Sequence, residues 1–372
     1  MSAVNLTTGL TARIAMETEP QAYTPPKETG LDKAVPWGFY HIDQAFPRGI
    51  KPLMSQLIAI QGEGGARKTT LLLNIILNQF LSGMLPAQYR MAVDSLETGM
   101  TIERYFMVMR CMLATKIMVY EFYTGPQGAH CLYEMFNRPL PNDPPELLLE
   151  GITSPKHGKM MKDCVLFPDY VEACYAAQPG FNFSERQVDA WEKAGAAIAT
   201  FPIIVYGVSE HYDEIEREKR FTDTSIIENA FERWLALAEK GIRQLVIDHI
   251  TAYFLDGSDY EKQMRVIPYL ERWVKLTGST LWAISQESVT NIRAARSGGK
   301  VVGSMGGNKL HFASQTDLRV DYDRDLRPFW TRFEILKGRR GHFPPIGIMT
   351  CPISGAMFGR TMEWEEIVRT RL

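Results

Sequence analysis

One short stretch, GEGGARKTT, combines the residue types that bind the phosphates of a nucleotide. Its candidate binding residues are Gly62, Gly64, Gly65, Arg67, Lys68, Thr69 and Thr70. In the pattern G-x-x-x-x-G-K-[ST], small residues let backbone N–H groups surround the phosphates, while the lysine and the hydroxyl meet phosphate and Mg²⁺. The stretch therefore predicts a site for ATP and Mg²⁺.

Arg67 stands where this pattern has its last glycine. A glycine is used there for a close backbone approach or for a backbone angle that residues with a Cβ avoid. Two hypotheses stay open: Arg67 points outward and adds a cation near the phosphates, or it lowers the affinity for nucleotide.

Two carboxylates follow apolar segments and could complete such a site. Asp248 ends the segment LVID, and a phosphate loop needs an acid at the end of a neighbouring strand to hold Mg²⁺. Glu97, in VDSLET, could orient or deprotonate an attacking water. The simpler interpretations also stay open: a turn residue for Asp248, an exposed charge for Glu97 and a packed structural residue for His249. Thr69 and Asp248 are the predicted metal-site residues.

The elements that must position these residues follow from hydrophobic periodicity. SQLIAIQG is a predicted strand that leads into the glycine-rich stretch, and TTLLLNIILNQFLSG is a helix closed by Gly83. Further predicted strands are YRMAVDSLE, FPIIVYG, IRQLVIDH, STLWAISQES, TDLRVDYD and RFEILKGRR. Near-continuous apolar strands that alternate with helices predict an α/β fold: a mostly parallel, twisted central sheet with helices on both faces.

Capping residues mark several helix ends. Capping-box spacing predicts helix starts at Ser184 with Gln187 and at Ser225 with Glu228. A later helix ends near Gly278, and Pro268 inside it predicts that this helix starts or kinks there.

Composition limits the class of protein. Of the 372 residues, 45% are hydrophobic, which suffices for a full core, and the net charge of −2 gives no global basic field. The five scattered cysteines favour reduced thiols in a cytoplasm over a disulfide framework or a zinc ribbon. No apolar run reaches the about 18 residues of a membrane span. Residues 1–34 are predicted to be a flexible arm, and the proline-rich residues 123–159 an irregular insertion into a domain spanning 35–372.

A basic, glycine-rich segment follows the strand that ends at Gln286. It carries Arg293, Arg296, Lys300 and Lys309, with His311 close by. Such a loop suits the backbone of single-stranded DNA, which it would grip without reading bases. The alternative is an ordinary surface loop.

Four further motifs carry a family resemblance. SLET is similar to SLEM of the DnaB-type replicative helicases, VIDHIT to the magnesium-site strand of T-odd phage helicases, AISQES to the DnaB segment SQLNR, and ILKGRRG to a segment near the family's C-terminus. With the phosphate loop, and in the same order, they resemble the RecA-like ATPase of hexameric helicases, including Twinkle, over about residues 35–372. One departure is that Ser314 stands where the family has a glutamine.

The resemblance implies a role for each matching residue. Lys68 and Thr69 would hold phosphate and Mg²⁺, Glu97 would be the catalytic base, and Asp248 the second magnesium-site group. Gln286 would sense the γ-phosphate. Lys337 and Arg339 would reach the next subunit's site, where Arg339, or its rival Arg340, would be an arginine finger.

The resemblance also implies partners. They are single-stranded DNA in the channel of a homo-oligomeric ring, expected to be a hexamer, and a separate primase or loader, in a replication system of phage or plasmid type. A recombinase or a KaiC-like regulatory ATPase would share the same fold and loop. A different class is a non-catalytic platform, in which Arg67 marks a degenerate site.

Overall fold

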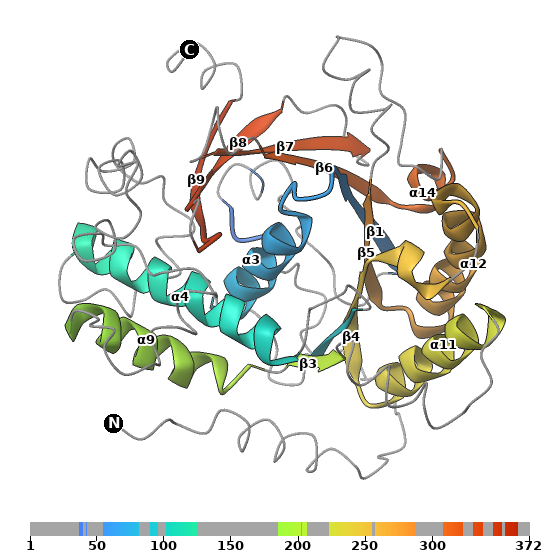
Figure 1. The fold of residues 1–372 in the computed structure, drawn as a ribbon, viewed down its shortest axis with the longest axis horizontal. Helices are drawn as coiled ribbons and strands as arrows, with labels where there is room; N and C mark the ends of the chain where they lie inside the picture. Colours follow the sequence, from blue (N-terminus) through green and yellow to red (C-terminus); the bar gives the residue numbers. More distant parts are fainter. Residues whose placement is uncertain are drawn as a thin grey trace.

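A nine-stranded sheet runs through the protein (Figure 1). The computed structural model describes residues 37–39, 42, 55–81, 90–95, 102–124, 185–201, 203–206, 223–254, 257–286, 308–322, 330–337, 345–351 and 354–363. The strand order is β3-β2-β4-β5-β1-β6-β7-β8-β9.

The first six strands are parallel and the last three are antiparallel. The parallel strands are β1 (Gln56–Gly62), β2 (Arg90–Ser95), β3 (Ile203–Tyr206), β4 (Ile242–Asp248), β5 (Thr280–Gln286) and β6 (Thr316–Tyr322). The antiparallel strands are β7 (Trp330–Lys337), β8 (Ile346–Thr350) and β9 (Met357–Glu363). Hydrophobic periodicity did not predict β8, β9 or the change of direction after β6.

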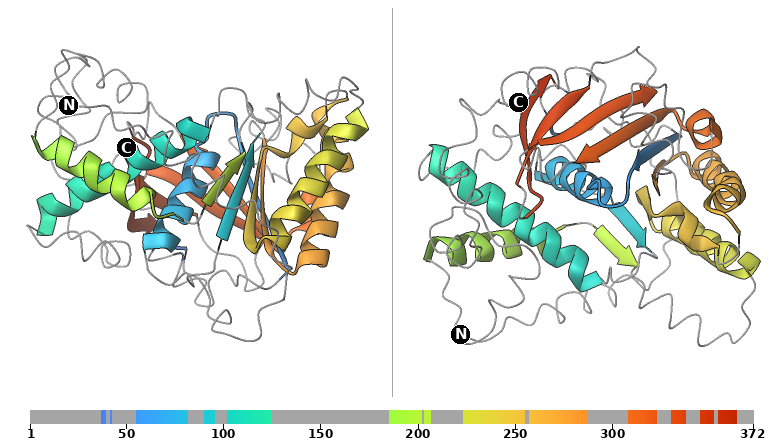
Figure 2. Two further views of the ribbon diagram at one scale, coloured as in Figure 1. Left: turned by 90° about the horizontal axis from the view of Figure 1, so that it is seen from below. Right: turned by 45° about the horizontal axis from the view of Figure 1, so that its top comes forward.

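Helices cover both faces of the sheet (Figures 1 and 2). One face carries α3 (Lys68–Leu81), α4 (Ile102–Thr124) and α9 (Glu185–Ile198); the other carries α11 (Asp223–Glu239), the 3₁₀ helix η2 (Ile250–Tyr253), α12 (Asp259–Thr277) and α14 (Asn308–Ala313). Successive side chains of a strand point to opposite faces, so Ile58 and Ile60 pack into one core while Leu57 and Ala59 pack into the other. The expected α/β fold is therefore confirmed.

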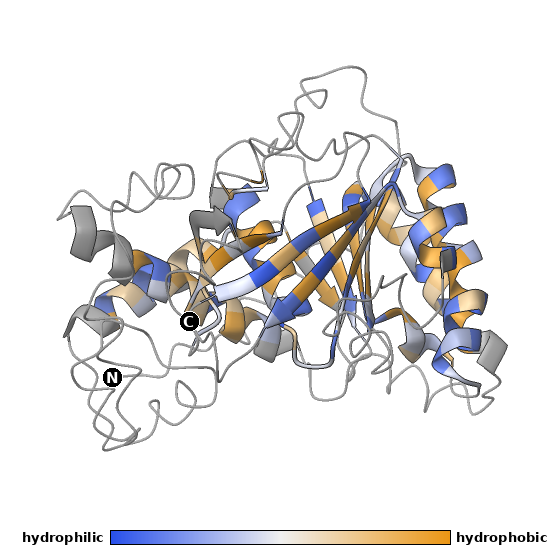
Figure 3. Cartoon of the chain, turned by 90° about the horizontal axis from the view of Figure 1, so that it is seen from above, coloured by the Kyte–Doolittle hydropathy of each residue, from blue (hydrophilic) through white to orange (hydrophobic). Residues whose placement is uncertain are grey.

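The distribution of hydrophobic residues follows this layering. Figure 3 shows hydrophobic residues along the strands, whereas the helices carry both hydrophobic and hydrophilic ones. In α12, for example, Ile267 and Leu270 are buried while Tyr260 is half exposed. No helix in the described ranges is long and apolar enough to cross a membrane.

The helix-end predictions were right in part. The predicted end near Gly278 is confirmed, since this residue adopts the left-handed conformation (φ 65°) and caps α12. The Ser225 prediction is wrong, because α11 already begins at Asp223. The capping box that the structure shows joins Ser258 and Glu261 at the start of α12, which sequence reasoning missed.

Pro268 neither starts nor ends a helix. α12 begins at Asp259 and continues through Pro268 to Thr277. Burial of Ile267 and Leu270 on either side gains about 1.5–3 kcal/mol for each side chain, which offsets the roughly 3 kcal/mol cost of an internal proline.

Other predicted boundaries fall at the edge of the described ranges. α4 extends to Thr124 and so takes in the first residues of the predicted insertion 123–159. The rest of that insertion, the arm at residues 1–34, and Ser184 and Gly83 lie outside the described residues.

Candidate nucleotide-binding site

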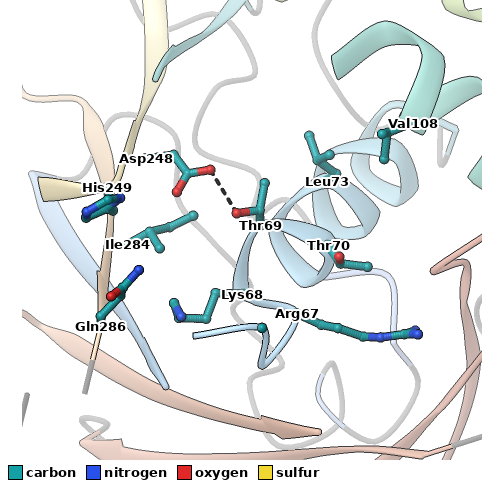
Figure 4. Close-up of a pocket in the computed structure, with 11 residues that line it drawn as sticks. Arg67, Lys68, Thr69, Thr70, Leu73, Val108, Asp248, His249, Ile284 and Gln286 are labelled. Carbon is teal, nitrogen blue, oxygen red and sulfur yellow. Dashed lines mark hydrogen bonds between the residues drawn. The ribbon is translucent and has the colours of Figure 1, made fainter. Parts of the chain in front are cut away.

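The predicted site residues meet at the carboxyl ends of the parallel strands. β1 and β5 pair in register, so that Gly62 lies beside Gln286, and β2 pairs with β4, so that Ser95 lies beside Asp248. In open α/β sheets, ligands bind in the crevice outside these strand ends. A pocket of about 300 Å³ opens there, lined by residues that include Lys68, Thr69, Asp248, His249, Ile284 and Gln286 (Figure 4).

The loop between β1 and α3 has the shape that its glycines allow. A Cβ on Gly62 would lie 2.3 Å from the carbonyl oxygen of Val320 in β6, so only glycine fits there. Gly65 has φ +77°, a region that favours glycine. The loop leads into α3 at Lys68. The first N–H groups of a helix have no partner within it, and together with the helix dipole they make its N-terminus an anion site.

Lys68 sits at the mouth of this loop. Its side chain is nearly buried, and its Nζ donates hydrogen bonds to the carbonyl oxygens of Gly62 (3.1 Å) and Glu63 (2.7 Å). The ammonium therefore lies where the loop curves around the pocket. This is the position from which a phosphate-loop lysine reaches a phosphate oxygen.

Asp248 is the buried carboxylate of the site. Its Oδ2 accepts hydrogen bonds from Thr69 Oγ1 at 2.8 Å and from Tyr105 OH at 2.9 Å. Burial raises the pKa of Asp248 above its usual value, while these two hydrogen bonds and the charge of Lys68 oppose that rise. Sequence reasoning missed Tyr105, which lies within an apolar helix and carries no motif.

The pair formed by Thr69 and Asp248 fits Mg²⁺. This ion takes oxygen ligands, usually one or two from the protein, and completes its shell with water and substrate phosphates. Here a hydroxyl and a carboxylate lie together at the strand edge, beside the loop that would hold the phosphates. Within the described residues, no group of three or more His, Cys, Asp or Glu side chains offers an alternative metal site.

Arg67 leaves the site by its side chain. Figure 4 shows the guanidinium extending away from Lys68 and Asp248. It stacks on the ring of Tyr322, with Cζ 3.8 Å from the centroid, and Nη1 donates to the carbonyl oxygen of Cys351 at 2.9 Å. Of the two hypotheses, the outward direction holds, but the charge is directed to the C-terminal strands. Sequence reasoning missed both Tyr322 and Cys351.

Gln286 and His249 both line the pocket. Gln286 ends β5 and directly precedes the basic segment of the chain. His249 follows Asp248, and a cis peptide bond joins the two. Glu97 lies outside the described residues, two positions after the end of β2.

Lys337 lies away from the pocket, at the C-terminal end of α14. Its Nζ donates hydrogen bonds to the carbonyl oxygens of His311 (2.6 Å), Phe312 (3.1 Å) and Ser314 (2.6 Å). Burial lowers the pKa of Lys337, and the nearby carboxylate of Asp317 opposes this. The structure of one chain thus gives Lys337 a role within its own subunit, and its predicted reach into a neighbour stays a prediction.

A buried network links the same helix to β1. Asp317 Oδ1 accepts a hydrogen bond from Gln61 Nε2 (2.6 Å), and its Oδ2 lies 2.7 Å from His311 Nδ1. Lys309 lies on this helix. The other predicted DNA contacts, Arg293, Arg296 and Lys300, and the finger candidates Arg339 and Arg340, lie outside the described residues.

Solved structures share this arrangement over nearly the whole chain. The structure of the ATPase domain of a phage helicase has a TM-score of 0.53 at 12% identity, with 96% of this chain and 98% of that chain covered. A DnaB-like replicative helicase, solved to study its interactions with primase, has a TM-score of 0.55 at 13% identity, with 96% and 68% covered. The sequence matches no family model and no curated protein. At these identities the likeness is one of fold: the chain has the RecA-like fold of replicative-helicase ATPase domains.

Proposed function

We propose that this protein binds ATP with Mg²⁺ in the pocket at the strand ends and hydrolyses it. The contact between Thr69 Oγ1 and Asp248 Oδ2 carries this proposal. It brings the hydroxyl of a phosphate-loop helix to the acid of a neighbouring strand, beside a nearly buried lysine. A glycine-rich turn without a function would have no need of that combination.

The residues of the chain divide the chemistry among them. The N–H groups at the start of α3 and the Lys68 ammonium bind phosphate oxygens, and Thr69 and Asp248 hold the Mg²⁺ ion. When bound, the ion neutralises charge that develops on the phosphate oxygens. Glu97 orients the attacking water and accepts its proton. Gln286, beside Gly62, contacts the γ-phosphate end of the nucleotide.

We further propose that hydrolysis drives movement along single-stranded DNA, as in a ring-forming replicative helicase. Gln286 supports this, since it lines the pocket and directly precedes the segment with Arg293, Arg296 and Lys300. A change at the nucleotide can therefore pass to the DNA-binding segment through adjacent backbone. The shared fold with two helicase ATPase domains also supports it. A separate primase or loader is the partner that we propose for this motor.

The ATPase proposal is tested by hydrolysis with and without single-stranded DNA. We expect DNA to stimulate wild-type turnover and Lys68→Ala to reduce it by at least about 100-fold. Lys240→Ala, in the turn before β4, is the matched control and should behave as wild type. Folded wild-type protein that neither binds nor hydrolyses ATP would contradict the proposal and favour a non-catalytic platform.

The DNA-binding part needs its own test. Binding to oligo-dT is measured against salt for the triple variant Arg293→Ala, Arg296→Ala, Lys300→Ala. Each lost phosphate contact should lower the salt slope by about 1. A triple variant of Lys240, Lys262 and Lys275 to alanine removes the same charge from the α12 side of the molecule and should keep the slope. Equal losses in both variants would mean that the segment is only a surface loop.

Electron microscopy separates the motor from its nearest rival. With ATP and single-stranded DNA, we expect closed rings, with hexamers as the main class. Filaments along the DNA would instead indicate a recombinase, and assemblies that ignore DNA a regulatory ATPase.

A further inference from the structure

Arg67 has an unusual backbone conformation. Among the described residues it is the one non-glycine residue with a positive φ, at 65°. In this left-handed region the Cβ crowds the following carbonyl, which is why glycine is usual there. The phosphate loop therefore keeps the shape that a glycine would give it, although an arginine occupies the position.

The Arg67 side chain is held at three points. Nη2 donates to Tyr322 OH at 3.0 Å, the guanidinium lies flat over the same ring, and Nη1 donates to the carbonyl oxygen of Cys351. Stacking of a guanidinium on an aromatic ring and hydrogen bonds from a charged donor are both stronger than neutral contacts. These contacts favour the one backbone conformation from which the side chain can reach them.

The acceptor side of this contact is itself fixed to α3. The hairpin turn between β8 and β9, here Cys351 and residues 354–356, is closed by a hydrogen bond from Gly355 N to Cys351 O at 3.0 Å. Asn74 in α3 donates to Gly355 O (3.0 Å) and accepts from Met357 N (2.8 Å). The hairpin turn thus cannot move away from α3 without breaking buried hydrogen bonds.

The turn also packs directly on the first residues of α3. A Cβ on Gly355, which has φ +74°, would come within 2.8 Å of Thr70 Cγ2. The phosphate loop is therefore enclosed by α3 behind it and by the hairpin turn and the end of β6 on one side. Arg67 is the side chain that joins the loop to both of the latter.

We propose that Arg67 is a positioning residue that preforms the phosphate loop by anchoring it to Tyr322 and the hairpin turn. This rests on the proposed binding of nucleotide in the same pocket. A glycine at this position permits the left-handed angle but leaves the loop free to take others. The anchored arginine selects that angle, and it makes phosphate binding depend on strands at the far end of the chain.

The proposal predicts an order among substitutions. Arg67→Ala keeps the strained Cβ but loses the anchor, so it should weaken ATP binding most, by about tenfold or more. Arg67→Gly loses the anchor without strain and should weaken binding by only about two- to fivefold. Tyr322→Phe keeps the ring and should fall between wild type and Tyr322→Leu.

A double-mutant cycle tests the anchor. Calorimetric titration with Mg²⁺ and ATP gives Kd and the binding-competent fraction for wild type, Arg67→Gly, Tyr322→Leu and the double variant. We expect Tyr322→Leu to raise Kd by about tenfold when Arg67 is present, but by less than about twofold in the Arg67→Gly background. A purely structural role would lower the competent fraction or the melting temperature and leave Kd unchanged.

A second arginine–aromatic pair serves as the matched control. Arg265 stacks over Phe254 at 4.0 Å, outside the pocket, and Arg265→Ala should leave Kd unchanged. Equal effects of Tyr322→Leu in both backgrounds would overturn the anchor while ATP binding stands. If wild type binds no ATP, the proposed function fails and this inference with it. Melting curves of the same four proteins then still show whether the Arg67–Tyr322 contact forms.

Discussion

Thr69 Oγ1 donates a hydrogen bond to Asp248 Oδ2 at 2.8 Å, although 179 positions separate the two residues in the sequence. The contact joins the first turn of α3 to the end of β4 across the crevice of the sheet. It places a hydroxyl and a carboxylate, two suitable Mg²⁺ ligands, next to the phosphate loop. Substitutions at this contact and at its neighbours should therefore affect nucleotide chemistry and stability in different ways.

Asp248→Asn should separate function from stability. The asparagine oxygen can still accept from Thr69 and Tyr105, but the charge is lost. Because burial raises the pKa of Asp248, ionisation opposes folding at neutral pH, and its removal should raise stability by about 1 kcal/mol. ATP hydrolysis should fall by at least about 100-fold. Thermal melting without nucleotide and a turnover assay check both; a destabilised variant would contradict the burial argument.

Gly62→Ala and Gly64→Ala form a matched pair in one loop. The added Cβ at Gly62 would clash with Val320 O, whereas nothing lies within 4 Å of one at Gly64. We expect Gly62→Ala to cost about 1–3 kcal/mol and to abolish ATP binding. Gly64→Ala should change stability by no more than about 0.5 kcal/mol. Denaturant unfolding and ATP titration distinguish them, and similar behaviour of the two variants would argue against the close approach of β1 and β6.

Tyr105→Phe should weaken catalysis through Asp248. The substitution removes one donor to Oδ2, raises the pKa of Asp248 further, and costs about 1 kcal/mol of stability. Turnover should fall about three- to tenfold, with more Mg²⁺ needed for half-maximal activity. Tyr253→Phe is the control, because its buried hydroxyl contacts the Asp94 carbonyl instead. It should cost similar stability but leave turnover unchanged; a loss of turnover in both variants would point to general destabilisation.

Lys116 should give the protein a stability that rises with pH. The side chain is fully buried between α4 and α3, where its Nζ donates to Asn78 Oδ1 at 2.8 Å, and burial lowers its pKa well below 10.5. Between the lowered pKa and about 10.5, unfolding takes up a proton, so stability falls as pH falls through this window by up to about 1.4 kcal/mol per unit.

Lys116→Met removes this proton uptake. Urea unfolding of wild type and variant between pH 7 and 10 should show the wild type gaining stability relative to the variant as pH rises. Lys275→Met, at an exposed position in the last turn of α12, is the matched control and should follow the wild-type profile. Parallel profiles of wild type and Lys116→Met would contradict the prediction.

Lys337→Met should loosen α14. Three carbonyl oxygens at the end of this helix lose their donor, so its amide hydrogens should exchange about tenfold faster in dilute protein without DNA. Lys309→Met, on the same helix, is the control and should exchange as wild type. If exchange in α14 is unchanged and only the assembled protein loses ATPase activity, Lys337 acts on a neighbouring subunit instead.

Much of the fold could be predicted from local patterns. The segments before and after the glycine-rich stretch form β1 and α3, and IRQLVIDH forms β4, because hydrophobic periodicity and turn residues act within a few positions. The same reasoning misplaced the start of α11, since Ser225 and Glu228 have capping-box spacing but lie inside the helix. It also missed β8 and β9.

The sequence by itself determined which residue types are available for the site: a phosphate loop with Lys68 and Thr69, an acid at Asp248 and an arginine at position 67. Only the tertiary structure decided which side chains meet them. Tyr105 reaches Asp248 because α4 crosses the strand ends, and Tyr322 and Cys351 receive Arg67 because β6 lies next to β1 and the hairpin turn packs on α3. The physical reason is that local patterns set helices and strands, whereas strand order and the packing of distant segments set the contacts of a site.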